Sequence, residues 1–442
     1  MTSVTKPPGG IGSLIRESAL YGMASLAGTL ATLLLAPVYL HVLDPAEYGK
    51  AALVTTAGTF LFIASIMALD TASHRMLWES EKDEHRRRVF GTWLWTSLAA
   101  STAVYALILV VWGAFTAFGR GSDILMLTVI WGISLPFRIV QHVRLQWARA
   151  HRRPLSAAAW ALALALLTTV FGLLFVPVLG LGAAGIVLSQ TVATVLVGGI
   201  ALATPTTRRL LTMGVDQTLL RRMIRFSLPL LPAGLATWFL AFGDRWILEI
   251  FYGDDSVGLY QAAFTVAGLV ALPLAAFNQA FPPWAFSIHK NPDGRQQLRR
   301  AFVVMMGASA AAAFVVSIAS GLLIRILAQD EFEPARTMVP YLVFSLVAQA
   351  AFSFTAIGCN VAERNGPIAK AMLAGALVIV PVVLISDPWL DADSVALSTL
   401  VSQLVAAALV TWSSERLWRV GYGWRCPAFT ACACIAAIAI AG

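Results

Sequence analysis

A few charged residues of this chain lie inside or at the edges of long apolar stretches: Asp244, Arg245, Arg138, Arg16 and Asp70. An arginine at the middle of a bilayer costs about 2.5–3.5 kcal/mol on insertion scales, so such a residue usually faces a cavity or a partner. Guanidinium groups hold anions such as phosphate, and carboxylates hold cations. These residue types therefore predict binding and transport rather than bond cleavage.

Asp244 and Arg245 are the strongest candidates, because they stand together between Trp238 and Ile250. In one interpretation Arg245 faces a central cavity and binds an anionic group, while Asp244 tunes it or forms a cation site. In the other, the two residues pair with their neighbours, or Arg245 snorkels outward beside Trp246. The sequence leaves both open.

The other candidates are more ambiguous. Arg138 follows Pro136, where a broken helix can expose backbone groups to a water-filled cavity; alternatively, the stretch ends early and leaves Arg138 near the surface. Arg16 opens the first stretch and is either an entry residue for a phosphate or an ordinary anchor. Asp70 lies near the end of the second stretch, where it caps or bridges helices or acts as a coupling carboxylate.

No catalytic or metal-binding pattern accompanies these charges. The sequence has no Gly-rich phosphate loop with a following Lys, and none of its 6 histidines pairs with a carboxylate at helical spacing deep in an apolar stretch. We expect no cofactor, no metal, no ATP hydrolysis and no enzyme activity. We interpret the 4 cysteines, Cys359, Cys426, Cys432 and Cys434, as small apolar membrane residues.

The elements that position these residues must be membrane helices. The chain has 442 residues, of which 58% are hydrophobic and 12% charged, and its mean hydropathy is +0.76. That is far more apolar surface than one soluble core can bury. Twelve stretches are near the roughly 20 residues that cross a bilayer: 16–40, 50–72, 90–116, 124–143, 155–178, 182–204, 224–251, 258–281, 301–327, 337–359, 368–386 and 395–413.

Lys and Arg concentrate in both tails and in every second connection between these stretches. By the positive-inside bias, the amino terminus is cytoplasmic. The net charge of +8 then reflects orientation and contact with anionic lipid headgroups, not nucleic acid. The first stretch is expected to be retained rather than cleaved as a signal peptide. Three forms are open to the apolar tail 421–442: a short extra crossing, an interfacial helix or a packed end.

The second half of the sequence repeats the first at a shift of roughly 208 to 213 residues. Segment 402–410 matches 189–197, and segment 253–258 corresponds to 44–49. Six stretches per half make the repeats parallel, which is typical of transporters that work by alternating access. We therefore predict an all-α membrane protein of two six-helix bundles, divided into 1–205, a cytoplasmic linker 206–225, 226–420 and a tail 421–442.

Short motifs at the helix ends carry a family resemblance. They are YLHVLDPAEYG at 39–49, ALDTA at 68–72 with Arg75, SLPLLP at 227–232 with GDRWIL at 243–248, VGLY at 257–260, and AFNQAF at 276–281 with Pro283. In this order they resemble the polysaccharide-exporter branch of the multidrug/oligosaccharidyl-lipid/polysaccharide (MOP) superfamily, the O-antigen-type oligosaccharide flippases. The resemblance covers nearly the whole chain.

This resemblance implies the outward flip of an undecaprenyl-diphosphate-linked oligosaccharide across the bacterial cytoplasmic membrane. It implies coupling to a Na+ or H+ gradient, and cationic cavity residues, a role that Arg245 and Arg138 fit. The implied partners are the lipid-linked oligosaccharide, membrane lipids, and a polysaccharide polymerase with other export proteins; nucleic acid is not among them.

Three alternatives remain. A cation-coupled multidrug exporter of the same superfamily would use Asp70 or Asp244 as the coupling carboxylate. A peptidoglycan-precursor flippase would usually have a longer chain with fourteen spans. A polysaccharide polymerase or ligase would normally carry a large outer loop, which this chain lacks among its predicted connections.

Overall fold

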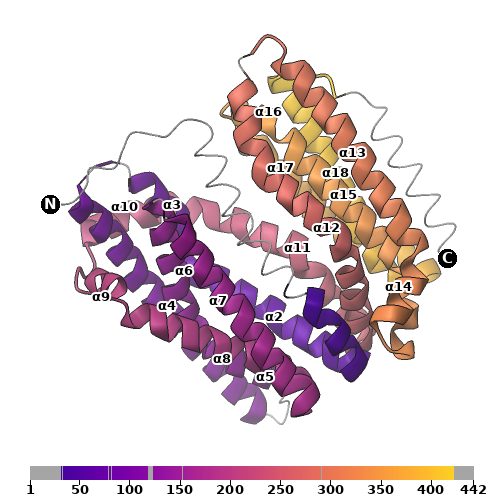
Figure 1. The fold of residues 1–442 in the computed structure, drawn as a ribbon, viewed down its shortest axis with the longest axis horizontal. Coiled ribbons are helices and arrows are strands. Elements are labelled where there is room, and N and C mark those ends of the chain that lie inside the picture. The colour runs from indigo at the N-terminus through magenta and orange to yellow at the C-terminus, as the bar shows by residue number, and fades with distance from the viewer. Residues whose placement is uncertain are drawn as a thin grey trace.

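The computed structural model describes residues 31 and 33–422, apart from 78, 81, 118–122, 152 and 290. Within these ranges the chain is helical, without strands (Figure 1). In chain order the elements are Leu33–Val42, α2 (Pro45–Ile66), α3 (Leu69–Met76), α4 (Asp83–Ala117), α5 (Asp123–Gly132), α6 (Leu135–Ala150), α7 (Pro154–Leu173), η1 (Leu174–Val178), α8 (Gly182–Ala203), α9 (Pro205–Leu211), α10 (Gln217–Ser227), η2 (Leu228–Leu230), α11 (Leu231–Tyr252), α12 (Asp254–Ile288), α13 (Gly294–Ile318), α14 (Ser320–Leu327), η3 (Asp330–Thr337), α15 (Val339–Thr355), α16 (Ile357–Val361), α17 (Gly366–Leu390) and α18 (Asp393–Leu417).

Nine helices of the described chain are long and apolar enough to cross a membrane, and the pair α5–α6 makes a tenth. They account for the second to sixth and the eighth to twelfth predicted stretches. The first stretch lies mostly outside the described residues, which show only its end, Leu33–Val42. The seventh is α11, which is not among these ten. It is less apolar, because it contains Asp244, Arg245 and Glu249.

Several predicted stretches are interrupted. The second was expected to be continuous over 50–72, but α2 ends at Met67 and Ala68, which have positive φ angles of 52° and 53°. A left-handed conformation at two successive residues with side chains is strained and persists only where packing enforces it. The fourth stretch bends by 46° between α5 and α6, as Pro136 suggested. The seventh starts with a 3-10 turn, η2, that contains Pro229.

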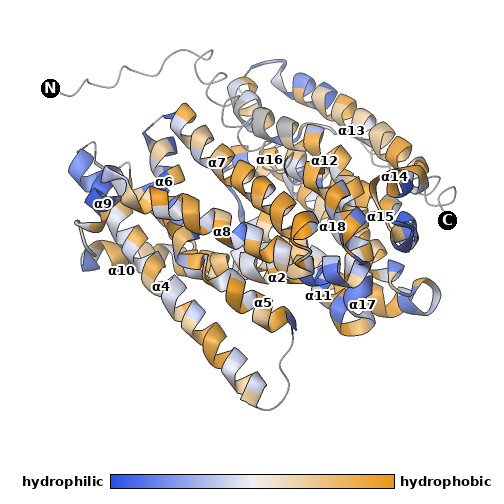
Figure 2. Cartoon of the chain, turned by 60° about the horizontal axis from the view of Figure 1, so that its bottom comes forward, coloured by the Kyte–Doolittle hydropathy of each residue, from blue (hydrophilic) through white to orange (hydrophobic). Residues whose placement is uncertain are grey.

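The helices form two bundles. In the first, α8 packs against α6 and α7, and α4 packs against α6; in the second, α18 packs against α15 and α17, and α12 against α15. Figure 1 shows α4–α9 on one side and α12–α18 on the other, with α2 and α11 between them. Hydrophobic residues run along the helices, while α9 at one end is hydrophilic (Figure 2). Where the bundles divide within the sequence stays a prediction.

Large apolar side chains cover much of the outside of both bundles. Val110 is 68% exposed, Leu166 63% and Leu384 59%. In water such a surface would drive aggregation, whereas in hydrocarbon it has no cost. The described chain is therefore a multi-span membrane protein, and these residues form its lipid-facing surface.

The bundles meet mainly through α2 and α12. A methyl group added at Gly49 would overlap the carbonyl oxygen of Asp254, and one added at Gly258 would overlap that of Pro45. The two contacts are reciprocal, because segments 44–49 and 253–258, where α2 and α12 begin, correspond to each other in the repeat. From this crossing the bundles diverge toward the end that carries α3, α10 and α16 (Figure 1), which we call the basic end because α9 and α10 hold Arg208, Arg209, Arg221, Arg222 and Arg225.

The Gly258→Ala variant tests this crossing. The added methyl group must displace backbone, so we expect a loss of about 1–3 kcal/mol in stability, seen as a lower Tm in detergent. Gly307→Ala is the matched control, because a methyl group at this helical glycine of α13 meets nothing within 4 Å. An unchanged Tm for Gly258→Ala would show that the close approach of α2 and α12 is not required.

Candidate functional site

Asp244 and Arg245 lie within α11, and both are almost completely buried, with exposed fractions of 3% and 2%. The guanidinium Nη1 of Arg245 is 2.9 Å from Asp244 Oδ1, which also accepts the backbone N–H of Arg245 at 2.8 Å. A buried charge requires such a partner, since an isolated one would lose its solvation without compensation. The two adjacent residues thus neutralise each other within one helix.

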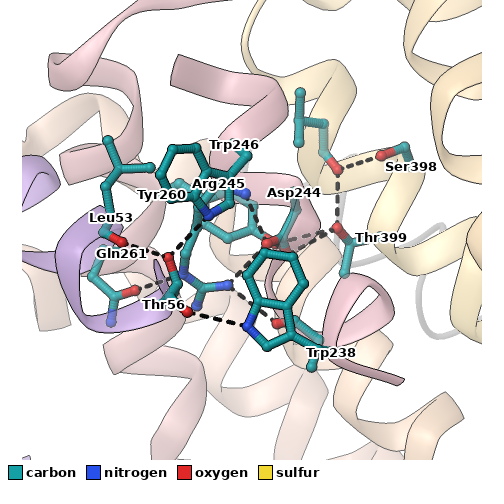
Figure 3. A network of polar contacts seen from close by, with 12 residues as sticks. Leu53, Thr56, Trp238, Asp244, Arg245, Trp246, Tyr260, Gln261, Ser398 and Thr399 are labelled. Carbon is teal, nitrogen blue, oxygen red and sulfur yellow. Dashed lines mark hydrogen bonds and ion pairs between the residues drawn. The ribbon is translucent and has the colours of Figure 1, made fainter. Parts of the chain in front are cut away.

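Residues of the second bundle make further hydrogen bonds to this ion pair (Figure 3). Gln261 of α12 accepts a hydrogen bond from Arg245 Nε at 2.9 Å. On the other side, the Tyr260 hydroxyl donates to Asp244 Oδ2, and the Thr399 hydroxyl of α18 lies 3.4 Å from the same oxygen. The pair therefore joins α11 to α12 and α18 by charge-assisted hydrogen bonds, which are stronger than those between neutral groups.

Aromatic rings enclose the guanidinium. Its Cζ atom lies 4.7 Å from the centroid of Phe264, 5.3 Å from that of Tyr260 and 5.6 Å from that of Phe242. Cation–π contacts of desolvated arginines contribute up to about 2 kcal/mol each. In this conformation Arg245 is paired with its neighbours, which was one of the two interpretations left open. Its role in binding substrate stays a prediction.

Helix α11 also contacts the first bundle. The indole N–H groups of Trp246 and Trp238 donate to Thr56 of α2, to the hydroxyl at 3.2 Å and to the carbonyl at 3.1 Å (Figure 3). Movement of α2 relative to α11 would break both hydrogen bonds. The environment of Arg245 is therefore coupled to the contact between the bundles.

Sequence reasoning gave no role to Tyr260, Gln261 and Thr399. Tyr260 was noted only as part of the VGLY motif, and the other two are single polar residues in apolar stretches. Gln261 bonds Arg245, and Tyr260 and Thr399 bond Asp244, which becomes visible only when α12 and α18 are placed beside α11. The available signal was their polarity inside membrane helices, which predicts an inward-facing partner but does not identify it.

Arg138 lies in the first bundle, one turn into α6 after the bend. Its Cζ atom is 4.8 Å from the centroid of Trp131, and its Nε is buried without a hydrogen-bond partner among the described residues. None of the carboxylates in the described ranges forms an ion pair with it. Trp131 in turn donates to Gln190 of α8 at 3.3 Å, and Gln190 donates to Thr55 of α2 at 3.2 Å.

The predicted site residues do not converge. Arg138 belongs to the first bundle and the Asp244–Arg245 pair to the second, whereas Asp70 lies in the first turn of α3, where it accepts the Thr71 N–H at 2.8 Å. Arg16 lies outside the described residues. Within the described chain no three His, Cys, Asp or Glu side chains form a metal-binding group. Cys359 is buried as a free thiol, and the other three cysteines lie outside the described residues.

Solved structures of several transporters share this fold. The lipid II flippase MurJ in an inward closed conformation aligns with a TM-score of 0.70 and 12% identity, covering 96% of this chain and 97% of the other. A mutant of the MATE transporter VcmN from Vibrio cholerae aligns with a TM-score of 0.60 and 13% identity, covering 93% and 99%. An inward-facing multidrug resistance MATE family transporter of the MOP superfamily gives 0.59 and 16%, covering 91% and 94%. At these identities the likeness establishes the fold alone.

A search among curated proteins finds no match. The family model described as polysaccharide biosynthesis protein matches residues 14–289, which is more than half of the chain and includes the first bundle, the linker, α11 and α12. Together with the fold, this match confirms the resemblance derived from the helix-end motifs. The chain belongs to the polysaccharide biosynthesis protein family and has the transporter fold of the MOP superfamily.

Proposed function

We propose that this chain flips an undecaprenyl-diphosphate-linked oligosaccharide from the inner to the outer leaflet of the bacterial cytoplasmic membrane, with its amino terminus in the cytoplasm. Family membership supports this proposal, as does the fold shared with a lipid II flippase. The observation that carries it is Arg138: within the described membrane spans, this arginine has no carboxylate to neutralise it. A cation held there at a cost of a few kcal/mol needs an anionic ligand.

A diphosphate supplies that anion. Arginine binds phosphate with several N–H donors at once, and the interaction is strongest where water is excluded. Arg138 takes the diphosphate, the sugars cross in the polar space between the bundles, and the polyprenyl tail stays in lipid. The bundles swing about the contact between α2 and α12, and no nucleotide is hydrolysed. A polymerase on the outer side then consumes the product.

Arg245 acts in a second step. Because Asp244 already neutralises it, Arg245 contacts a phosphate only if Asp244 is compensated by a proton or a cation. Movement of α2 would disturb the two tryptophan contacts beside this pair and permit the exchange. Asp244 is thus the coupling carboxylate of the second bundle, and the gradient supplies the ion.

Arg138→Gln is expected to abolish surface polysaccharide in a deletion strain that expresses the variant, because an uncharged amide cannot hold the diphosphate. Arg209→Gln is the control, since this exposed arginine of α9 lies outside the spans. Polysaccharide is measured at equal membrane levels of the two proteins. Normal polysaccharide with Arg138→Gln would remove this residue from the mechanism.

Variants of the Asp244–Arg245 pair distinguish a role in stability from a role in transport. Asp244→Asn leaves a buried cation unpaired, so we expect a stability loss of about 3–5 kcal/mol, whereas the double variant Asp244→Asn/Arg245→Gln loses less because neither charge remains. Tm in detergent measures this difference. If Arg245 binds substrate, the double variant reaches the membrane but does not export polysaccharide; full export would confine the pair to a structural role.

The leaflet location of the lipid-linked oligosaccharide tests the proposal as a whole. In a deletion strain the oligosaccharide is expected to accumulate on the cytoplasmic side while surface polysaccharide is lost. A normal pool and normal polysaccharide, together with increased sensitivity to drugs, would instead assign the chain to the multidrug exporters, which have the same fold.

A further inference from the structure

The indole of Trp131 lies against the guanidinium of Arg138. Trp131 belongs to the last turn of α5 and Arg138 to the first turn of α6, on opposite sides of the 46° bend. Side chains of an α-helix lean toward its amino terminus, so Arg138 reaches back across the bend, and its Cζ atom lies 4.8 Å from the ring centroid. Trp131 is 1% exposed, whereas Arg138 is half-buried. The ring therefore supports the cation from the interior of the bundle.

The backbone of the bend fixes the spacing of these two residues. The carbonyl oxygen of Trp131 accepts both the N–H of Ser134, at 3.0 Å, and its hydroxyl, at 2.8 Å. The carbonyl oxygen of Ser134 in turn accepts the N–H of Arg138 at 2.9 Å. These hydrogen bonds connect the end of α5 to the start of α6, so the bend holds the ring and the guanidinium at a defined separation.

Two other helices fix the indole itself. Its N–H donates to Gln190 of α8 at 3.3 Å, and Gln190 donates to Thr55 of α2 at 3.2 Å. One face of the ring lies against Gly58 of α2, because a methyl group added to this glycine would come within 2.4–2.5 Å of three ring atoms. Trp131 can approach α2 this closely only because residue 58 has no side chain.

This support leaves the donors of Arg138 unused. A cation–π contact places the charge over a ring and requires no N–H donor, and a guanidinium has five such donors for an anion. The Nε of Arg138 is buried without a hydrogen-bond partner among the described residues. Arg245 differs, because its Nε and Nη1 already donate to Gln261 and Asp244. Arg138 is thus held in place by a contact that does not compete with phosphate oxygens.

We propose that Trp131 is the positioning residue for Arg138, and that it holds the guanidinium beside the bend with its N–H donors directed to the diphosphate. Gly58 and Gln190 act through Trp131 by fixing its ring. The proposal rests on the proposed function, in which Arg138 takes the diphosphate. It adds that the affinity for the diphosphate depends on residues that do not touch it.

Binding of farnesyl diphosphate to the purified full chain in nanodiscs of zwitterionic lipid tests this role, with farnesol as the probe that lacks phosphate. Trp131→Leu removes the ring, so the Kd for farnesyl diphosphate is expected to rise about tenfold, the equivalent of one desolvated cation–π contact. The Kd for farnesol should stay the same. Trp131→Phe keeps a ring under the guanidinium and should recover most of the affinity. An unchanged Kd for farnesyl diphosphate in Trp131→Leu overturns the proposal.

Trp93→Leu is the matched control for the loss of a buried ring. Trp93 is 0% exposed, belongs to α4 of the same bundle, and contacts the rings of Phe90 and His142. Both leucine variants are expected to lower the Tm in detergent, but Trp93→Leu should bind farnesyl diphosphate as the wild type does. An equal rise of Kd in both variants would mean that lost packing, and not the position of Arg138, weakens binding.

Gly58→Ala displaces the ring without removing it. Because the added methyl group would overlap the indole, the Kd for farnesyl diphosphate is expected to rise as in Trp131→Leu. Gly199→Ala is its control, since a methyl group at this glycine of α8 meets nothing within 4 Å. A wild-type Kd for Gly58→Ala would show that the placement of the ring has no effect on the diphosphate, contrary to the proposal.

A double variant shows whether Trp131 acts through Arg138. Trp131→Leu/Arg138→Gln should bind farnesyl diphosphate no more weakly than Arg138→Gln alone, because the ring has no guanidinium left to position. A further tenfold loss in the double variant would contradict this route.

Arg138→Gln alone separates this proposal from the proposed function. If Arg138→Gln weakens the binding of farnesyl diphosphate while Trp131→Leu and Gly58→Ala do not, only the positioning role is wrong. If Arg138→Gln binds it like the wild type, or if the wild type binds it no better than farnesol, the assignment of the diphosphate to Arg138 is wrong and the positioning role is wrong with it.

Discussion

The close approach of α2 and α12 is the constraint on which the rest of the structure depends. It is possible only because Gly49 and Gly258 have no side chain where each faces the backbone of the other half. Each half contributes its equivalent glycine to this contact, so the two repeats meet here through corresponding residues. Because α2 and α12 make the main contact between the bundles and belong to one buried apolar core, any tilting of the bundles must repack this contact. The same helix α2 carries Thr56 toward α11 and Phe62 toward His142, so tilting affects the polar groups of both bundles.

The buried arginines of the two bundles differ in whether a carboxylate neutralises them. In the second, Arg245 is neutralised by Asp244 and surrounded by rings, and a fully satisfied network of this kind fixes α11 against α12 and α18. In the first, Arg138 and His142 keep buried nitrogens without partners within the described residues. Unsatisfied groups store free energy that a ligand or a proton can release. The contrast is confined to the two arginines, because Glu249 of α11 and Asp254 of α12 also have buried oxygens without partners within the described residues.

The positions of the second to twelfth spans could be predicted from the sequence because a long apolar stretch is what a bilayer crossing requires. The break at Met67–Ala68 could not, since neither residue favours a left-handed conformation and only packing imposes it. Arg245 and Asp244 were found from their cost in a membrane, but their partners Tyr260, Gln261 and Thr399 depend on how α12 and α18 are placed. His142 received no role from the sequence, whereas in the structure its ring lies against Phe62 of α2 and Trp93 of α4.

The polarity of α11 has a consequence for how the protein is made. Each charged residue at the centre of a helix costs about 2.5–3.5 kcal/mol during insertion, and α11 leaves the ribosome before Tyr260 and Gln261 of α12 have been synthesised. Insertion of α11 alone would place the Asp244–Arg245 pair in lipid with half of its hydrogen bonds missing. The tight turn at Gly253, with φ at 82°, allows α11 and α12 to enter together as a helical hairpin. The seventh helix therefore depends, for its own entry into the bilayer, on the helix that follows it.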